Sequence, residues 1–235
     1  KDGSLLEPDK IGQWDGFIFY ATGDLTQPSK SDPAPPMTAA GKKALLGAIR
    51  AGKGFAAIHA GNDAFRLGEK GVDPFIRMLG AEFAGHGKQQ EALVRVTDAN
   101  FPGMEGIKDF KLLDEWYTNR NIATNLHVIL VLDTKGMEGA PYQREPLPAA
   151  WGRMNGKGRV YYNSLGHRED VWDNPMFQKM LIGGFRWAFG DAEANVPPNL
   201  KETAPQDPKW MAPALPKAGG AKKKGGKKAA AEAAK

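Results

Sequence analysis

The sequence predicts an α/β sandwich with a mostly parallel sheet, because short, continuously apolar runs alternate with one-sided helical patterns along the chain. The chain has 235 residues, 41% of them hydrophobic and 25% charged, which suits one soluble domain with an appendage. No apolar run is long enough to cross a bilayer. The absence of cysteine excludes disulfides, thiolate metal ligands and a cysteine nucleophile.

The first three predicted elements are a strand, a helix and a second strand. Residues 14–20 form an almost continuous apolar run, as in a buried parallel strand. Within 37–49, apolar residues recur at helical spacing on one side, and Gly52 would end this helix. The run 55–58 predicts a second buried strand, which ends at His59.

The later elements are shorter, apart from the last helix. That helix is the clearest element of the chain, since Asn174 can cap it, Pro175 suits its first position and Gly190 follows its apolar stripe. The patterns before it predict a short helix and four strands, over residues 73–79 and over 92–96, 126–132, 149–154 and 158–162 respectively.

Composition divides the chain into three parts, of which residues 1–190 form the predicted domain. Residues 191–216 contain six prolines and no hydrophobic period, which predicts an extended segment without a core of its own. Residues 217–235 contain seven lysines and one acid, and subtracting their charge of +6 from the net +5 leaves about −1 for the rest. We therefore expect a disordered, solvated Lys/Ala/Gly tail and no specific nucleic-acid site on the nearly neutral domain. Weak binding of polyanions by the tail is the less favoured alternative.

Polar residues follow the predicted strands at the end where parallel sheets bind ligands. His59 comes directly after the strand 55–58, and His167 follows the strand 158–162. Thr22 and Asp24 follow the first strand in the same way. Because these side chains come from distant parts of the sequence, their predicted convergence is the main evidence for a site.

Two further segments are candidates for the same site. His86 stands between two glycines, where the backbone can approach a ligand closely. Residues 114–117 place two acids beside two aromatic residues, a group that suits a sugar because carboxylates accept hydrogen bonds from hydroxyls and an aromatic ring covers an apolar sugar face. The alternative is an edge segment with Trp116 in the core. His127 lies inside an apolar run and is expected to be structural.

Several other chemistries are weakly supported. Two or three of these histidines with Glu115 could bind a divalent metal, although no local His spacing indicates one. Ser164 lies close to His167 in sequence, but the chain has no nucleophile elbow around it. The glycines around Lys53 precede a strand, so they do not form a phosphate loop.

Five segments in order resemble the ThuA-like, or trehalose-utilisation, family, namely 19–24, 52–60, 83–86, 114–117 and 158–167. The resemblance covers about residues 5–190 and implies the class I glutamine amidotransferase-like fold, a flavodoxin-like three-layer sandwich. It also implies that a strand and a helix normally precede the point where this chain begins, so we expect the first strand to be lacking here. The chain starts with Lys1 and shows no targeting segment, which leaves its compartment open.

The resemblance also indicates which chemistry is absent. Amidotransferases of this fold carry their nucleophilic cysteine on the turn after a strand that resembles 55–58, where this chain has His59. Their catalytic histidine follows a late strand, as His167 does here. Without the cysteine, we expect no amidotransferase activity.

The resemblance implies a protein that acts on or binds a sugar or sugar derivative, in metabolism of the trehalose or keto-sugar type. We expect acid–base or metal-assisted chemistry, with the residues in two groups: His59, His167 and Glu115 as catalytic, and Thr22, Asp24, His86, Asp114, Trp116 and Tyr117 as substrate-binding. A divalent metal is compatible with these residues, and no other cofactor is expected. The alternative is a non-catalytic carbohydrate-binding or interaction module on the same fold. The sequence leaves the oligomeric state open.

Overall fold

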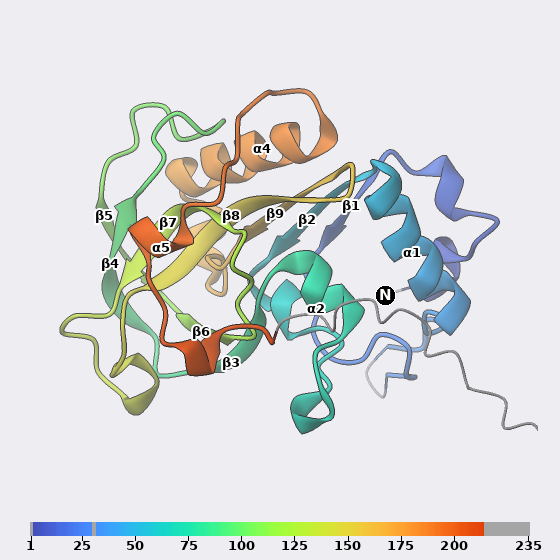
Figure 1. Ribbon diagram of the computed structural model, residues 1–235, viewed down its shortest axis with the longest axis horizontal. Helices are drawn as coiled ribbons and strands as arrows, with labels where there is room; N and C mark the ends of the chain where they lie inside the picture. Colours follow the sequence, from blue (N-terminus) through green and yellow to red (C-terminus); the bar gives the residue numbers. More distant parts are fainter. Residues whose placement is uncertain (1, 30–31, 214–235) are drawn as a thin grey trace, which may run out of the picture.

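A seven-stranded sheet lies between two layers of helices in the computed structural model, which describes residues 2–29 and 32–213 (Figure 1). The helices are α1 (Ala39–Ala51), α2 (Pro74–Leu79), α3 (Glu169–Trp172), α4 (Pro175–Phe189) and α5 (Leu200–Thr203). The main sheet contains β1 (Gly16–Phe19), β2 (Gly54–Ile58), β4 (Gln90–Val96), β5 (Phe110–Asp114), β7 (His127–Asp133), β8 (Leu147–Asn155) and β9 (Gly158–Asn163). A separate two-stranded sheet pairs β3 (Glu82–His86) with β6 (Tyr117–Arg120). The three-layer α/β class is as predicted.

The main sheet is mixed, which corrects the prediction of a mostly parallel sheet. Its order is β1-β2-β9-β8-β7-β4-β5, and only β1, β2 and β9 run parallel to one another. The remaining neighbours are antiparallel. The reason is visible at the junction of β8 and β9, where Gly156 and Lys157 make a two-residue turn with Gly156 at φ 64°. Such a short connection can join only antiparallel strands.

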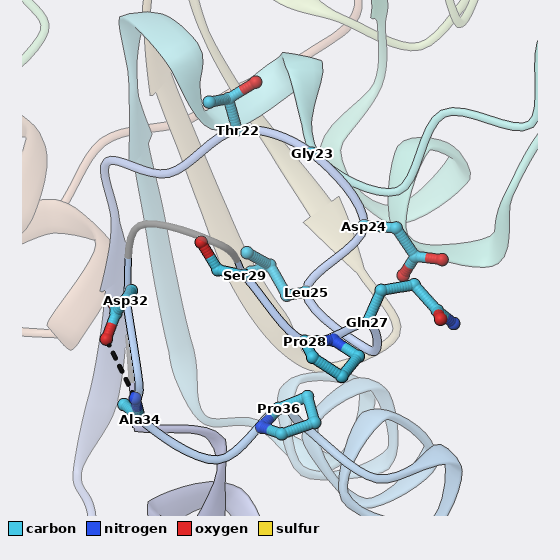
Figure 2. Close-up of a pocket in the computed structure, with 10 residues that line it drawn as sticks. All are labelled: Thr22, Gly23, Asp24, Leu25, Gln27, Pro28, Ser29, Asp32, Ala34 and Pro36. Carbon is cyan, nitrogen blue, oxygen red and sulfur yellow. Dashed lines mark hydrogen bonds between the residues drawn. The ribbon is translucent and has the colours of Figure 1, made fainter.

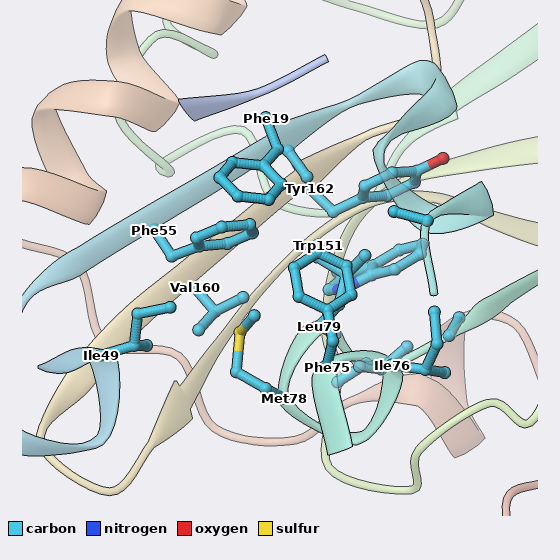
Figure 3. Close-up of a cluster of buried hydrophobic side chains, with 14 of the residues drawn as sticks. Phe19, Ile49, Phe55, Phe75, Ile76, Met78, Leu79, Trp151, Val160 and Tyr162 are labelled. Atoms are coloured by element: carbon cyan, nitrogen blue, oxygen red, sulfur yellow. The ribbon is translucent and has the colours of Figure 1, made fainter. Parts of the chain in front are cut away.

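Two hydrophobic clusters fill the space on either side of the sheet. Along β2, Phe55 and Ala57 face the cluster under α1 and α2, whereas Ala56 and Ile58 face the cluster under α4. Figure 3 shows the first cluster, where Phe55 lies against Phe19 with ring centroids 5.1 Å apart. Burial on both faces explains why these strands read as continuous apolar runs.

Both ends of α4 are found at the predicted residues, and Gly52 ends α1 as expected, whereas the residue that caps the start of α1 was not predicted. The Thr38 hydroxyl accepts a hydrogen bond from the Gly41 backbone N–H at 2.9 Å at the start of α1. Asn174 caps α4 by accepting from the Met176 N–H at 2.9 Å. Gly190 ends α4 at φ 90°, a conformation that glycine adopts without strain. Three strands were not predicted, β3, β5 and β6, because their residues are mainly polar or half-exposed.

The segment after α4 packs onto the domain. Leu200 and Ala204 belong to the first hydrophobic cluster. The Asn199 side chain accepts from the Val128 N–H at 2.6 Å and donates to the Val128 carbonyl at 3.0 Å. This segment therefore has no core of its own but adds to that of the domain. The predicted tail, 217–235, lies outside the described residues, and no helix among those described could span a membrane.

The pairs β4–β5 and β3–β6 are two parts of one antiparallel ribbon. The chain passes from β3 directly into β4 and from β5 directly into β6. Gln90 pairs with Asp114 in the first part, and His86 pairs with Tyr117 in the second. Between these two pairs, residues 87–89 on one strand oppose residues 115–116 on the other. This mismatch of three against two bends the ribbon. The bend brings Glu115 toward the carboxyl ends of β2 and β9.

Candidate active site

His59 occupies the turn directly after β2 and is 1% exposed. Its Nδ1 lies 2.7 Å from the Ser164 carbonyl oxygen, which can only accept, so Nδ1 carries the proton and the neutral ring has its lone pair on Nε2. Burial lowers the pKa of His59, which favours this neutral form. The residue has a φ of 40°, and the Tyr162 hydroxyl holds this left-handed turn by donating to the His59 carbonyl at 2.8 Å.

Glu115 and His167 meet His59 at one point. His59 Nε2 lies 3.4 Å from Glu115 Oε2 and 3.3 Å from His167 Nδ1. His167 Nδ1 lies 3.3 Å from the same carboxylate oxygen. The three atoms therefore form a nearly equilateral triangle, which we call the triad. Its members follow β2, β5 and β9, so the predicted convergence of the two strand-end histidines is found.

Asp114 positions the loop that carries His167. Its side chain is fully buried, and its Oδ2 accepts from the Gly166 N–H at 2.8 Å. Its Oδ1 accepts from the N–H groups of Glu115 at 2.9 Å and Arg168 at 3.2 Å. Burial raises the pKa of Asp114, against the effect of these hydrogen bonds. Because three backbone N–H groups already engage its carboxylate oxygens, Asp114 has a positioning role in place of the predicted substrate-binding role.

A buried tyrosine fixes the bend of the ribbon beside Glu115. The Tyr142 hydroxyl accepts from the Gly87 N–H and donates to the Trp116 carbonyl, both at 2.8 Å. It thereby bridges the two strands where their regular pairing is interrupted. The Trp116 ring is 0% exposed and donates to the Gln90 carbonyl at 2.8 Å. Trp116 is thus a core residue, and the predicted stacking role does not fit it.

Tyr117 and His86 surround the triad on the side of the small sheet. The Tyr117 ring lies 4.0 Å from the His59 ring between centroids, and burial followed by the charge of Glu115 raises the pKa of its hydroxyl. His86 is half-exposed, and its Nδ1 lies 2.9 Å from the Gly87 carbonyl and 3.3 Å from Glu115 Oε1. Both neighbours of this nitrogen are acceptors, so it carries a proton. Both residues are near enough to contact a molecule at the triad.

The triad opens to solvent beside His167, whose side chain is 39% exposed. A cavity of about 470 Å³ at this opening is lined by Gln89, His167, Arg168, Glu169 and Asp170. Arg168 donates to Gln89 at 2.9 Å and to both carboxylate oxygens of Asp170 at 2.9 and 3.0 Å. The arginine charge is therefore balanced within the protein, so the opening offers no unpaired arginine to an anionic ligand.

Tyr20 adds an aromatic face that was not predicted as part of the site. It is 49% exposed, and its hydroxyl donates to the Gly166 carbonyl at 3.2 Å, next to His167. Its ring meets Trp172 edge to face, with centroids 5.5 Å apart. The sequence signal was its position directly after β1, at the same end of the sheet as His59.

The loop that carries Thr22 and Asp24 has a cavity of its own. Both line a cavity of about 280 Å³ formed by residues of the segments 22–29 and 32–36 (Figure 2). The Thr22 hydroxyl bonds to the Asp63 carboxylate. Asp24 accepts from the Thr26 N–H at 3.0 Å, so it stabilises its own turn.

The fourth histidine, His127, is structural, as its sequence context indicated. It is buried, with Nδ1 2.7 Å from the Pro197 carbonyl and Nε2 2.8 Å from Asp98 Oδ2. Among the described residues, the group whose ligand atoms could share a metal ion is His59, Glu115 and His167, with those atoms within 4.8 Å of one another.

Comparison with known proteins identifies the family. A family model described as "ThuA: Trehalose utilisation" matches residues 2–188. The chain belongs to this family. The ThuA match includes the whole site, from Tyr20 to His167. No curated protein matches the chain.

Solved ThuA-like structures share the fold. One from Bacteroides uniformis has a TM-score of 0.62 and 20% identity, covering 80% of this chain and 74% of that one. Another, from Parabacteroides merdae, has a TM-score of 0.61 and 16% identity, covering 90% and 84%. A cytoplasmic protein of Salmonella typhimurium has a TM-score of 0.52 and 9% identity, covering 77% and 74%. At these identities the likeness concerns the fold alone.

Proposed function

We propose that this ThuA-family protein acts on a sugar or sugar derivative by acid–base catalysis at the triad. The observation that carries the proposal is the meeting of His59, Glu115 and His167 within 3.4 Å at one end of the sheet. Two imidazoles and a carboxylate are the side chains most suited to proton transfer near neutral pH. The family description, trehalose utilisation, supports a sugar as the class of substrate.

Each residue of the triad has a distinct proposed role. The neutral His59 presents the lone pair of Nε2, and Glu115 presents carboxylate oxygens, so either can accept a proton. His167 is partly exposed and can exchange the proton with solvent. A keto-sugar is a suitable substrate, because a carbonyl acidifies the neighbouring C–H and a base beside it can move that proton.

The surroundings support a neutral, polyhydroxylated ligand. Tyr20 offers a half-exposed ring against which the apolar face of a sugar can pack. Tyr117 can donate a hydrogen bond to a hydroxyl, and His86, whose Nδ1 carries the proton, can accept one at Nε2. The charge of Arg168 is already paired with Asp170. Amidotransferase activity is not proposed, because the chain contains no cysteine to act as the nucleophile.

The proposal is tested by incubating the protein with trehalose and with 3-keto glucosides and following the products by NMR. We expect turnover of at least one of these sugars, and a loss of about 100-fold or more in Glu115→Gln and His167→Ala. Glu91→Gln is the matched control, because the exposed Glu91 side chain on β4 pairs with Lys111 rather than with the triad, and it should keep wild-type activity. Sugar binding without turnover would favour the binding-module alternative. The absence of both binding and turnover would refute a sugar function.

A further inference from the structure

The atoms of the triad are spaced more like metal ligands than like hydrogen-bonded partners. Their separations of 3.3, 3.3 and 3.4 Å exceed the usual N–H···O range of about 2.7–3.2 Å. Around a tetrahedral ion, two ligands are separated by about 1.6 times the bond length, or about 3.4 Å for bonds of about 2.1 Å. Around an octahedral ion, adjacent ligands would be only about 3.0 Å apart at the same bond length. The observed triangle has the size of one face of a tetrahedron.

Hydrogen bonds behind the triad fix the proton of His59 and orient the carboxylate of Glu115. The Ser164 carbonyl holds the proton of His59 on Nδ1, which leaves Nε2 to bind. His86 carries a proton on the nitrogen that faces Glu115 Oε1, so it orients the carboxylate whose other oxygen belongs to the triad. Ligating imidazoles and carboxylates are typically held by such outer partners.

A cation is the species that this arrangement stabilises best. Two imidazole nitrogens and a carboxylate oxygen face one another, and lone pairs at such separations repel unless a positive charge lies between them. A proton shared by the three groups is the alternative to a metal ion. The ligand set discriminates between metals, because Mg²⁺ and Ca²⁺ prefer oxygen ligands whereas two imidazoles and a carboxylate suit zinc-type ions.

We infer that His59 Nε2, His167 Nδ1 and Glu115 Oε2 bind one divalent transition-metal ion of the zinc type in a tetrahedral site. The fourth position faces the opening beside His167 and is available to a water molecule or to a sugar oxygen. This inference rests on the proposed function for its purpose and modifies it. With the ion bound, the three lone pairs of the triad would be occupied, and the ion would polarise a sugar carbonyl or hydroxyl in place of direct proton acceptance by His59 Nε2. The binding itself can be measured without any sugar.

The test is a titration of the chelator-treated full chain with Co²⁺, whose visible absorption is strong in tetrahedral sites. We expect one Co²⁺ per chain, displaced by Zn²⁺ but not by an equal concentration of Mg²⁺. Glu115→Gln and His167→Gln should each weaken binding by at least about 100-fold, more than the loss of an outer partner usually causes. His167 is partly exposed, so its variant is expected to fold even if changes at the buried His59 do not.

Two controls separate a metal site from general effects. His86→Ala removes an imidazole outside the triad and should keep one Co²⁺ per chain, with affinity lowered about tenfold. Glu91→Gln should bind like the wild type. No Co²⁺ absorption in the wild type, or equal binding in the triad variants and Glu91→Gln, would overturn the inference and favour the shared proton. Co²⁺ binding without sugar turnover would count against the proposed function alone. Sugar turnover that survives complete metal removal would count against a role of the metal ion in the reaction.

Discussion

Replacing Tyr142 by phenylalanine tests whether the bend of the ribbon positions Glu115. The hydroxyl of this buried residue makes two hydrogen bonds of 2.8 Å, to the Gly87 N–H and the Trp116 carbonyl. Tyr142→Phe keeps the ring that packs against Gly87 but leaves both backbone groups without that partner. A buried polar group left unpaired costs about 1–3 kcal/mol. Because the Gly87 site is only partly buried, we expect a total loss of about 2–4 kcal/mol in the free energy of unfolding.

The same change should reach the triad, because Glu115 directly precedes Trp116. Without the hydroxyl, the two strands are no longer held at the bend, and Glu115 Oε2 loses its fixed distance to His59 and His167. We expect the affinity for Co²⁺ to fall by about 10–100-fold, as for other residues that orient a ligand. Urea unfolding followed by circular dichroism measures the stability, and the Co²⁺ titration measures the site.

Tyr161→Phe is the matched control. Tyr161 is also buried, but its hydroxyl donates to the Met180 carbonyl of α4 at 3.4 Å and accepts from the Asn163 side chain at 3.1 Å rather than from the ribbon. This variant should lose stability while keeping the Co²⁺ affinity of the wild type. If Tyr142→Phe proved as stable as the wild type and bound Co²⁺ equally well, the Tyr142 hydroxyl would not be the group that fixes the bend.

Three further predictions follow from buried groups. Asp114→Asn replaces one acceptor oxygen by a donor and cannot satisfy all three N–H groups that Asp114 binds, so unfolding should require about 2 kcal/mol less in urea titrations. In the metal-free protein, burial lowers the pKa of His59 from its ordinary 6.5, so the unfolded chain binds the extra proton first as the pH falls below that value. The free energy of unfolding should therefore decrease as the pH falls below 6.5. In His59→Gln, the urea midpoint should depend less on pH in this range than in the wild type. Asp98→Asn removes the charged partner 2.8 Å from His127 Nε2. Because His127 Nδ1 holds the Pro197 carbonyl at 2.7 Å, the segment 191–213 should then open more often, and limited proteolysis within it should become faster than in the wild type.

The sequence alone determined the elements whose signals lie among chain neighbours. The apolar run of β2 and the capped stripe of α4 are local patterns, because burial on one or both faces selects residue types at a fixed period. The positions of His59 and His167 were predictable for the same reason, since His59 directly follows a strand that reads as buried and His167 comes a few residues after another. The gap between the predicted strands 149–154 and 158–162 was also too short for a parallel connection, a signal that the prediction of a mostly parallel sheet overlooked.

Only the tertiary structure decided how the acidic segment 114–117 is divided between the core and the site. Its four residues look equally suited to a ligand in sequence, yet Asp114 binds backbone N–H groups, Trp116 fills the core, and Glu115 alone completes the triad. The division depends on a bend held by Tyr142, a residue 26 positions away from Trp116. Hydrogen bonds between residues so distant in the chain leave no periodic trace in the sequence, because they constrain a few atoms rather than a repeating face.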